Sequence, residues 1–422
     1  MNPAIVIPTY WESDDVPCDL HERGSYDHAT SVGRPVPELE KCLASLEQVR
    51  GVMRVIVLVV AQPEVRKSAR ARVDGICRSH PKLNLLVIGA AEAQLVSSAV
   101  NRIAPNMDGE TISLRGYGAI RNMGLLVAGI LGYDIVVFMD DDEVAEDPNF
   151  LIDAVYGLGM KSSDNTPIQA KSGYFLNRDS SPFASDHVAW YNRQWSKHEG
   201  FNAWMKRALD ENTPRVIRSN VCCGGCMALH ASAFTEVPFD PWITRGEDLD
   251  YLLNLRLAGK DLWFDSAWHV RHLPPPTRHM PARFLQDVYR WMYEAAKLER
   301  ANKRIDVQRT SPSSLDPYPG PWLMPNVTSR IAWTSLLRAI GCPERKEYFW
   351  IFQHGRKEAA AYATANAERY WPFVACWQQV AAELWDDSFL ARRIIARGTP
   401  KAPTPSHTTS WMELTNNIGG TL

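Results

Sequence analysis

The most constraining stretch of this chain is a short apolar run that ends in three aspartates. Residues 135–138, Ile-Val-Val-Phe, predict a buried strand, and Asp140, Asp141 and Asp142 follow one position later. Carboxylates this close repel one another, so they are tolerated on a solvated turn or around a divalent cation. At the carboxyl end of a central strand we favour the cation. An acidic turn with helix N-capping by Asp147 is the alternative.

Strand and helix signals alternate through the first part of the chain. Strands are predicted at residues 4–7, 52–61 and 83–88, and helices at 37–49, 63–79 and 117–132. This alternation predicts an α/β fold with a Rossmann-like, doubly wound and mostly parallel sheet. In such sheets, ligands bind outside the carboxyl ends of the strands. The strand ends should therefore line one site, with Pro8, Thr9, Tyr10, Gln62, Asp140, Asp141 and Asp142.

A second acidic motif lies further along, in the stretch RGEDLDYLLNLRLAG. Its leucines make one apolar helical face, and Gly259 is a plausible C-terminal stop. Glu247 and Asp248 fall in the first turn, where the helix dipole stabilises negative charge. Simple capping is the alternative to a functional role for these two residues. Before this helix we expect a strand at 168–176, a helical stretch at 187–209, and a turn at Gly224 and Gly225 that needs backbone geometry closed to other residues.

Prolines 274–276 break the chain and predict the main domain boundary. We expect an α/β domain at residues 1–275, an α-helical domain at 276–396 that is rich in Trp and Tyr, and a flexible tail at 397–422. Residues 11–37 show no periodicity and predict a long loop.

Composition excludes several classes of function. The formal net charge of -2 does not suggest a nucleic-acid surface, which would need a strongly basic domain. No apolar run approaches the roughly 18–20 residues of a membrane span, and no secretory signal is evident. The eight cysteines are then expected to be reduced thiols. We expect a cytoplasmic protein, with peripheral membrane contact through the aromatic C-terminal third left open.

Four motifs in order resemble the family 2 glycosyltransferases with the GT-A fold. They are IVIPTY, then GAIRNMGLLVAG followed by DIVVFMDDDEV, then CGGCMALHASAF, and finally RGEDLDYLLNLRLAG. The resemblance covers roughly residues 3–275. It implies a GT-A domain that moves a sugar from a nucleotide-diphosphate donor to the hydroxyl group of a saccharide or small acceptor.

The resemblance also implies a divalent metal, Mn²⁺ or Mg²⁺, that assists the departing diphosphate. Asp142 would bind the metal directly, and Asp140 would face the ribose and a metal-bound water. Asp141 would point outward or support its neighbours. His272 matches the family's late histidine best, with His269 as the second candidate. An imidazole ligand would modestly favour Mn²⁺.

Further donor contacts follow from the same resemblance. Arg121 would contact the diphosphate, and Asn122 would hold the adjacent loop. Arg115 could add a phosphate contact from a mobile loop, although a solvated loop arginine is equally compatible with its position. The candidate donor-binding residues are together Pro8, Thr9, Tyr10, Glu12, Gln62, Arg115, Gly118, Arg121, Asn122, Asp140 and Asp141.

For the transfer step, the resemblance assigns the general base to Asp248 and an acceptor contact or loop-orienting role to Glu247. Such a base implies inversion at the anomeric carbon. A retaining synthase of a small glycoside, of the glycosylglycerate type, and a non-catalytic nucleotide-sugar-binding protein are the alternatives. Two departures leave the donor base open between uracil and guanine. Ala61 and Gln62 stand where the family has aspartates, and Trp11 stands where it has asparagine.

Overall fold

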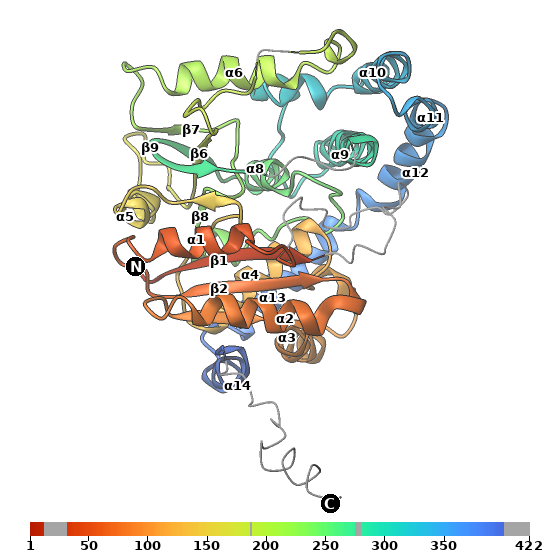
Figure 1. The fold of residues 1–422 in the computed structure, drawn as a ribbon. Helices are drawn as coiled ribbons and strands as arrows, with labels where there is room; N and C mark the ends of the chain where they lie inside the picture. Colours follow the sequence, from red (N-terminus) through yellow and green to blue (C-terminus); the bar gives the residue numbers. More distant parts are fainter. Residues whose placement is uncertain (12–31, 186–187, 275–279, 401–422) are drawn as a thin grey trace, which may run out of the picture.

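The computed structural model describes residues 1–11, 32–185, 188–274 and 280–400. Its sheet has nine strands, in the order β3-β2-β1-β4-β8-β6-β9-β5, with β7 paired to β9 (Figure 1). The strands are β1 (Pro3–Trp11), β2 (Val55–Ala61), β3 (Leu85–Ile88), β4 (Ile135–Phe138), β5 (Glu143–Val144), β6 (Ala170–Leu176), β7 (Val216–Arg218), β8 (Met227–His230) and β9 (Leu262–His272).

The helices account for most of the rest of the described chain. They are α1 (Glu38–Leu46), α2 (Arg66–Arg78), α3 (Ala90–Ile103), α4 (Tyr117–Ile130), α5 (Phe150–Val155), α6 (Lys197–Ala208), α7 (Ala231–Phe234), α8 (Glu247–Leu257), α9 (Met280–Ala301), α10 (Val327–Gly341), α11 (Arg345–Trp350), α12 (Arg356–Asn366), α13 (Tyr370–Glu383) and α14 (Ser388–Gly398).

The predicted α/β architecture is confirmed, with one refinement in the second half of the sheet. Strands β3, β2, β1 and β4 are parallel, as the alternating pattern predicts. Strand β8 then runs antiparallel to both β4 and β6, while β6 and β9 are parallel. The sheet is therefore parallel from β3 to β4 and mixed beyond β4.

Several predicted elements differ from the observed ones. The helical stretch expected at 187–209 contains a turn of 3-10 helix at Trp190–Asn192 and then α6, with Ser196 at a positive φ of 20° between them. The helical pattern at 345–393 divides into several helices. Strand β9, eleven residues long, has no counterpart among the predicted elements, and it carries His272.

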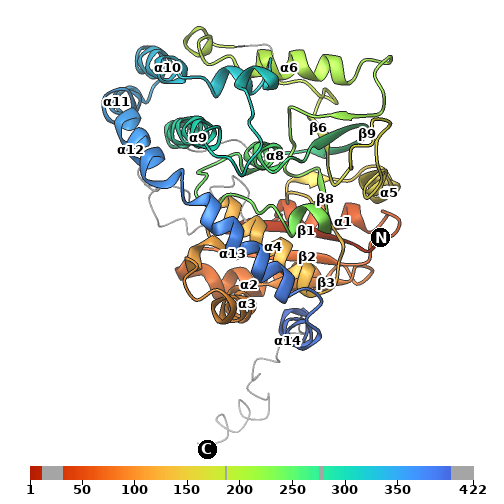
Figure 2. The same ribbon diagram turned by 180° about the vertical axis from the view of Figure 1, so that it is seen from behind.

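Apolar side chains of the parallel strands alternate between two cores, as buried strands require. In β1, Ala4 and Val6 belong to one core and Ile5 and Ile7 to the other. Helices α1, α2 and α5 cover the second core, whereas α3, α4 and the C-terminal helices α13 and α14 cover the first. Figure 2 shows α13 lying across α4 on this face.

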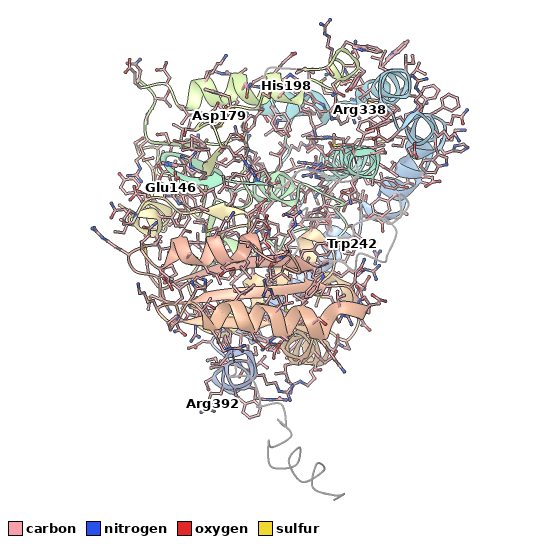
Figure 3. The ribbon with its side chains drawn as sticks, in the orientation of Figure 1. Glu146, Asp179, His198, Trp242, Arg338 and Arg392 are labelled. Carbon is pink, nitrogen blue, oxygen red and sulfur yellow. The ribbon has the colours of Figure 1, made fainter. Side chains whose placement is uncertain are left out.

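The helices after residue 280 are anchored to the α/β region by buried polar contacts. Lys297 of α9 is fully buried, and its Nζ donates to Asp240 Oδ2 at 2.8 Å, to Asn254 Oδ1 at 2.9 Å and to the Asp250 carboxylate. Trp242, labelled in Figure 3, accepts a hydrogen bond at its carbonyl from Tyr362 of α12 at 2.6 Å. The first core continues through α9 to α14, across the predicted boundary at the prolines.

Some predictions concern residues outside the described ranges, and the predicted domain boundary is not tested by the structure. Glu12 and most of the predicted loop 11–37 lie outside the described residues, as does the tail from 401 onward. The domain boundary at 275 stays a prediction. Within the described residues, no helix combines the length and apolarity that crossing a membrane requires.

The Lys297 contacts yield a stability prediction. Replacing Lys297 with Met removes the only positive charge that hydrogen-bonds to both Asp240 and Asp250 in the described contacts, and leaves two buried carboxylates facing each other. We expect the free energy of unfolding to fall by about 3–5 kcal/mol, the usual cost of breaking a buried ion pair from one side. Urea denaturation measures this loss.

The matched control is Lys303→Met on an exposed lysine. Lys303 pairs with Glu299 at 2.6 Å, but its side chain is 70% exposed. Exposed pairs contribute about 0–1 kcal/mol. Equal losses for the two variants would show that the Lys297 contacts do not anchor α9.

Candidate active site

Arg121 of α4 joins the two acidic motifs. Its Nη2 donates to Asp140 Oδ1 at 2.8 Å and its Nε donates to Glu247 Oε1 at 3.2 Å. Arg121 is 3% exposed, and its guanidinium lies 4.8 Å from the centre of the Phe138 ring. Residues more than one hundred positions apart are thus held together at the carboxyl end of β4. The structure therefore brings Arg121, Asp140 and Glu247 together.

Asp141 points inward, toward the end of β1. Its Oδ2 accepts a hydrogen bond from Thr9 Oγ1 at 2.7 Å, and the residue is 2% exposed. The expectation that Asp141 points outward is wrong, and the supporting role is the one observed. Thr9 and Asp141 fix the acidic loop to β1, because a buried carboxylate needs a donor.

Asp142 and His272 lie side by side at the other end of this loop. Asp142 Oδ2 is 3.4 Å from His272 Nε2, and Asp142 is 4% exposed. The pairing of β5 with β9 places Glu143 opposite His272, and Leu273 N donates to the Asp142 carbonyl at 2.9 Å. His269 instead packs against Tyr174, with ring centres 5.4 Å apart. Only the first candidate histidine therefore meets the acidic loop.

This pair suits a divalent cation in part. A carboxylate and an imidazole are acceptable ligands for Mn²⁺, and Mg²⁺ and Mn²⁺ commonly complete their shells with substrate phosphates and water. Asp140 is turned toward Arg121. Across the residues that the structure describes, no group of three or more His, Cys, Asp and Glu side chains is arranged to hold a metal.

Glu143 is a further acid at this site that sequence reasoning missed. It is 3% exposed, and its Oε2 accepts a hydrogen bond from Asp140 N at 3.0 Å. Burial raises the pKa of Glu143 well above its usual value, and the charges of Asp140 and Asp142 raise it further. The sequence signal for Glu143 was its position as the fourth acid in the run DDDE. Its inward direction depends on the turn that the loop makes.

Asp248 lies at the start of α8, beside the glycine pair of the preceding turn. Its Oδ2 accepts from Gly224 N at 3.2 Å and its Oδ1 from Leu249 N at 2.7 Å. A methyl group at Gly224 would lie 3.1 Å from Asp248 Cβ, and one at Gly225 would lie 2.0 Å from Glu143 Oε2. Close approach explains these glycines. The expectation of unusual backbone geometry is wrong, since neither has a positive φ.

Glu247 is buried beside Asp248 and is 6% exposed. Burial raises the pKa of its carboxyl, the Arg121 guanidinium opposes that rise, and the neighbouring Asp248 and Asp140 add to it. The two acids of this motif therefore differ in surroundings. Glu247 is tied to Arg121, whereas Asp248 is bound by backbone N–H groups.

Asn122 and Gly118 of α4 position loops. Asn122 is fully buried, and its Nδ2 donates to the carbonyls of Thr111 at 3.2 Å and Phe239 at 2.9 Å. A methyl group at Gly118 would lie 2.1 Å from the carbonyl oxygen of Asp240. Asn122 thus holds the adjacent loop as predicted, and Gly118 allows α4 to approach the backbone before α8.

A separate cavity of about 260 Å³ lies at the carboxyl end of β2, next to the first turn of α3. Its lining includes Ala61, Arg66, Arg70, Gly89 and Arg115.

The remaining predicted residues lie at the same edge of the sheet. Gln62 N donates to the carbonyl of Trp11 at 3.4 Å, which ties the ends of β1 and β2 together. Pro8 pairs in register with Leu58, and Tyr10 is buried in the first core. The Trp11 ring packs on Gly33, where an added methyl group would lie 2.5 Å from Trp11 Cε2.

Gly118 yields a second prediction. Gly118→Ala places a methyl group against backbone that cannot move freely, so we expect a loss of about 1–3 kcal/mol in the free energy of unfolding. Gly109→Ala is the control, because nothing lies within 4 Å of the added methyl group. Thermal and urea denaturation measure both. If Gly118→Ala kept its stability but bound the donor more weakly, the predicted donor contact of Gly118 would be favoured instead.

Comparison with known proteins identifies the family. The sequence profile described as glycosyltransferase like family 2 matches residues 34–294, more than half of the chain. The chain belongs to this family. It is therefore a glycosyltransferase, with an α/β region of the GT-A type followed by a mostly helical region. The matched range ends within α9, beyond the predicted domain boundary.

Solved structures resemble this glycosyltransferase only distantly. The mannosyltransferase PcManGT from Pyrobaculum calidifontis, in complex with GDP-Man and Mn²⁺, has a TM-score of 0.44 and 16% identity, covering 91% of this chain and 87% of that one. TarS of S. aureus has a TM-score of 0.36 and 13% identity, covering 91% of this chain and 55% of its own. No curated protein matches the sequence. Because both TM-scores are below 0.5, the family assignment depends on the profile match.

Proposed function

We propose that this glycosyltransferase transfers a sugar from a UDP- or GDP-sugar to an acceptor hydroxyl, with Mn²⁺ or Mg²⁺ and with inversion at the anomeric carbon. The observation that carries the proposal is the pair of contacts made by Arg121. Through them, the aspartate loop after β4 and the acidic start of α8 share one site. A donor-side and an acceptor-side group must be this close for direct transfer.

Asp142 and His272 are the residues that would hold the metal. When bound, a divalent cation would supply Lewis-acid stabilisation to the departing diphosphate. Asp140 would contact the donor ribose and a metal-bound water while Arg121 fixes its orientation. Arg121 was predicted to contact the diphosphate, but its two carboxylate contacts support an orienting role as well.

The cavity beside β2 and α3 is our candidate for the nucleoside part of the donor. It opens at the same edge of the sheet, and the guanidinium groups of Arg66 and Arg115 among its lining residues suit the diphosphate that adjoins the nucleoside. This placement keeps the predicted role of Arg115. It also moves base recognition from Gln62 toward the first turn of α3.

Asp248 is our candidate for the general base. Backbone N–H groups bind both of its oxygens and so fix the orientation of the carboxylate that would accept the proton. Glu247, held by Arg121, would orient the loop or contact the acceptor. The acceptor is a saccharide or a small hydroxyl compound.

A ligand panel tests donor and metal together. We expect one of the UDP-, GDP- and dTDP-sugars to raise the melting temperature of the protein, and Mn²⁺ to increase that rise, because ligands that bind the folded state stabilise it. In Asp142→Ala, Mn²⁺ should no longer increase the rise in melting temperature that the donor causes. Glu211→Ala, an exposed acid on the loop after α6, is the control. An unchanged Mn²⁺ increment in Asp142→Ala would contradict the metal assignment.

Substitution of Asp248 tests the transfer step. We expect Asp248→Asn to lower kcat about 10²- to 10⁴-fold, the range for loss of a general base, while the donor still raises the melting temperature. Asp261→Asn, just after α8, should keep wild-type kcat. Full activity of Asp248→Asn would refute the base assignment. NMR of the product should show a β-linkage from an α-linked donor, and an α-linked product would exclude inversion.

A further inference from the structure

A group of cations lies between α6, α9 and the start of α8. It consists of Lys197 of α6, Arg245 of the loop before α8, and Arg290 of α9, which we call the cation cluster. Asp287 accepts from the first two, with Lys197 Nζ at 2.7 Å from its Oδ2 and Arg245 Nη1 at 3.3 Å from its Oδ1. Lys197 and Arg290 lie outside both acidic motifs, whereas Arg245 is the first residue of the motif RGEDLDYLLNLRLAG.

The cation cluster adjoins the proposed base. A methyl group at Gly246 would lie 1.9 Å from Arg290 Nη1, so the guanidinium rests on the backbone two residues before Asp248. Gly246 has a φ of +69°, a conformation that favours glycine. The charge of Asp248 also acts on Arg290. An acceptor that contacts Arg290 therefore lies within reach of the residue that would deprotonate it.

Acids other than Asp287 also act on the cation cluster, and Asp248 is one of them. Besides Asp287, the acid closest to the cluster is Glu294, whose Oε1 accepts from Arg290 Nε at 3.2 Å. Burial raises the pKa of Glu294 to about 7, so it is only partly ionised at neutral pH. Burial, with help from Arg245 and Arg290, lowers the pKa of Lys197 to about 8. Despite its burial, the pKa of Arg290 is raised by Glu294, Asp248 and Asp287, so the cluster keeps its positive charge although its cations lie close together.

Arg338 adds a fourth cation near Asp287. It lies on α10, where Figure 3 labels it, and the charge of Asp287 acts on it. Its Nε donates to Asn192 Oδ1 at 2.8 Å.

Arg290 retains unused hydrogen-bonding capacity. The residue is 7% exposed, and its Nη2 is buried without a hydrogen-bond partner among the described residues. Leaving a buried charged donor unsatisfied is costly, which favours a ligand that supplies the acceptor atom. The Trp291 ring lies 4.5 Å from the guanidinium and limits the directions from which that ligand can approach.

The cluster is not sealed from solvent. The side chains of Lys197 and Arg245 are each 25% exposed, whereas that of Asp287 is 9% exposed. Lys197 and Arg245 are therefore partly accessible to a ligand, whereas the acid that pairs with them is almost buried. This is the arrangement expected of an anion site, since guanidinium groups bind carboxylate and phosphate oxygens through paired N–H donors.

We propose that the cation cluster binds an anionic group of the acceptor, a carboxylate or a phosphate, and so presents the acceptor hydroxyl to Asp248. This inference rests on the proposed function and specifies its acceptor class. Arg290 and Arg245 would donate to the anion, and Lys197 would add a third charge-assisted contact.

Matched acceptors test the inference. With the donor selected by the ligand panel, transfer is measured to glucose, glucuronate and glucose 6-phosphate, and to glycerol, glycerate and glycerol 3-phosphate. We expect kcat/KM to be at least about tenfold higher for an anionic member than for the neutral one, the contribution of one charge-assisted hydrogen bond. The ranking of carboxylate against phosphate identifies the anion.

Variants separate binding from structure. Arg245→Gln should raise KM for the anionic acceptor about tenfold but leave kcat/KM for the neutral acceptors near the wild-type value. Arg245→Lys should bring KM for the anionic acceptor part of the way back. Arg392→Gln, an exposed arginine of α14 labelled in Figure 3 at the far end of the molecule, is the matched control. Equal losses for neutral and anionic acceptors would assign the cluster a structural role and overturn the inference.

Two further measurements keep the inference distinct from the proposed function. Donor hydrolysis without an acceptor tests the proposed function alone. If the enzyme hydrolyses the donor but shows no preference for anionic acceptors in the transfer assay, only the inference is overturned. Inorganic phosphate at constant ionic strength should raise the melting temperature of the wild type and of Arg392→Gln by similar amounts. The rise should be smaller for Arg245→Gln. The absence of any phosphate effect on the wild type would also overturn it.

Discussion

Arg121 carries a charge inside the protein, and its partners decide how the active site is assembled. A buried guanidinium must be neutralised by nearby carboxylates, since an unpaired charge in the interior is very costly. Here the partners are Asp140, after β4, and Glu247, at the start of α8. The aspartate loop after β4 and the start of α8 are consequently held by one residue of α4. Displacement of either motif would leave the guanidinium only partly neutralised.

The same logic extends the site toward the C-terminal helices. Lys297 of α9 neutralises Asp240 and Asp250, one in the loop before α8 and the other in α8 itself. About two turns earlier, Arg290 of the same helix rests on Gly246. The helical region is therefore part of the wall of the site. This position explains how a glycosyltransferase of this family could acquire its own acceptor preference without any change in the donor motifs.

Much of the donor side was predictable because local sequence determines it. The apolar run at residues 135–138, followed by aspartates, predicts the end of a buried strand. The order of strands and helices then restricts the topology. Asp142 and His272 lie 3.4 Å apart in the structure, yet the strand that carries His272 was not predicted. The inward direction of Asp141 and the burial of Glu143 were also not foreseeable, because a turn of one residue more or less would reverse which carboxylates face the sheet.

The sequence by itself determined the family, the α/β class and the chemical character of the acidic motifs, since these depend on residue type, order and short-range periodicity. Only the tertiary structure decided which charges meet. Arg121 with Glu247, Lys297 with Asp240, and Arg290 with Gly246 join residues that are far apart in the chain. Such contacts depend on how helices pack on the mixed half of the sheet, and packing is set by the whole set of buried side chains, not by any one motif.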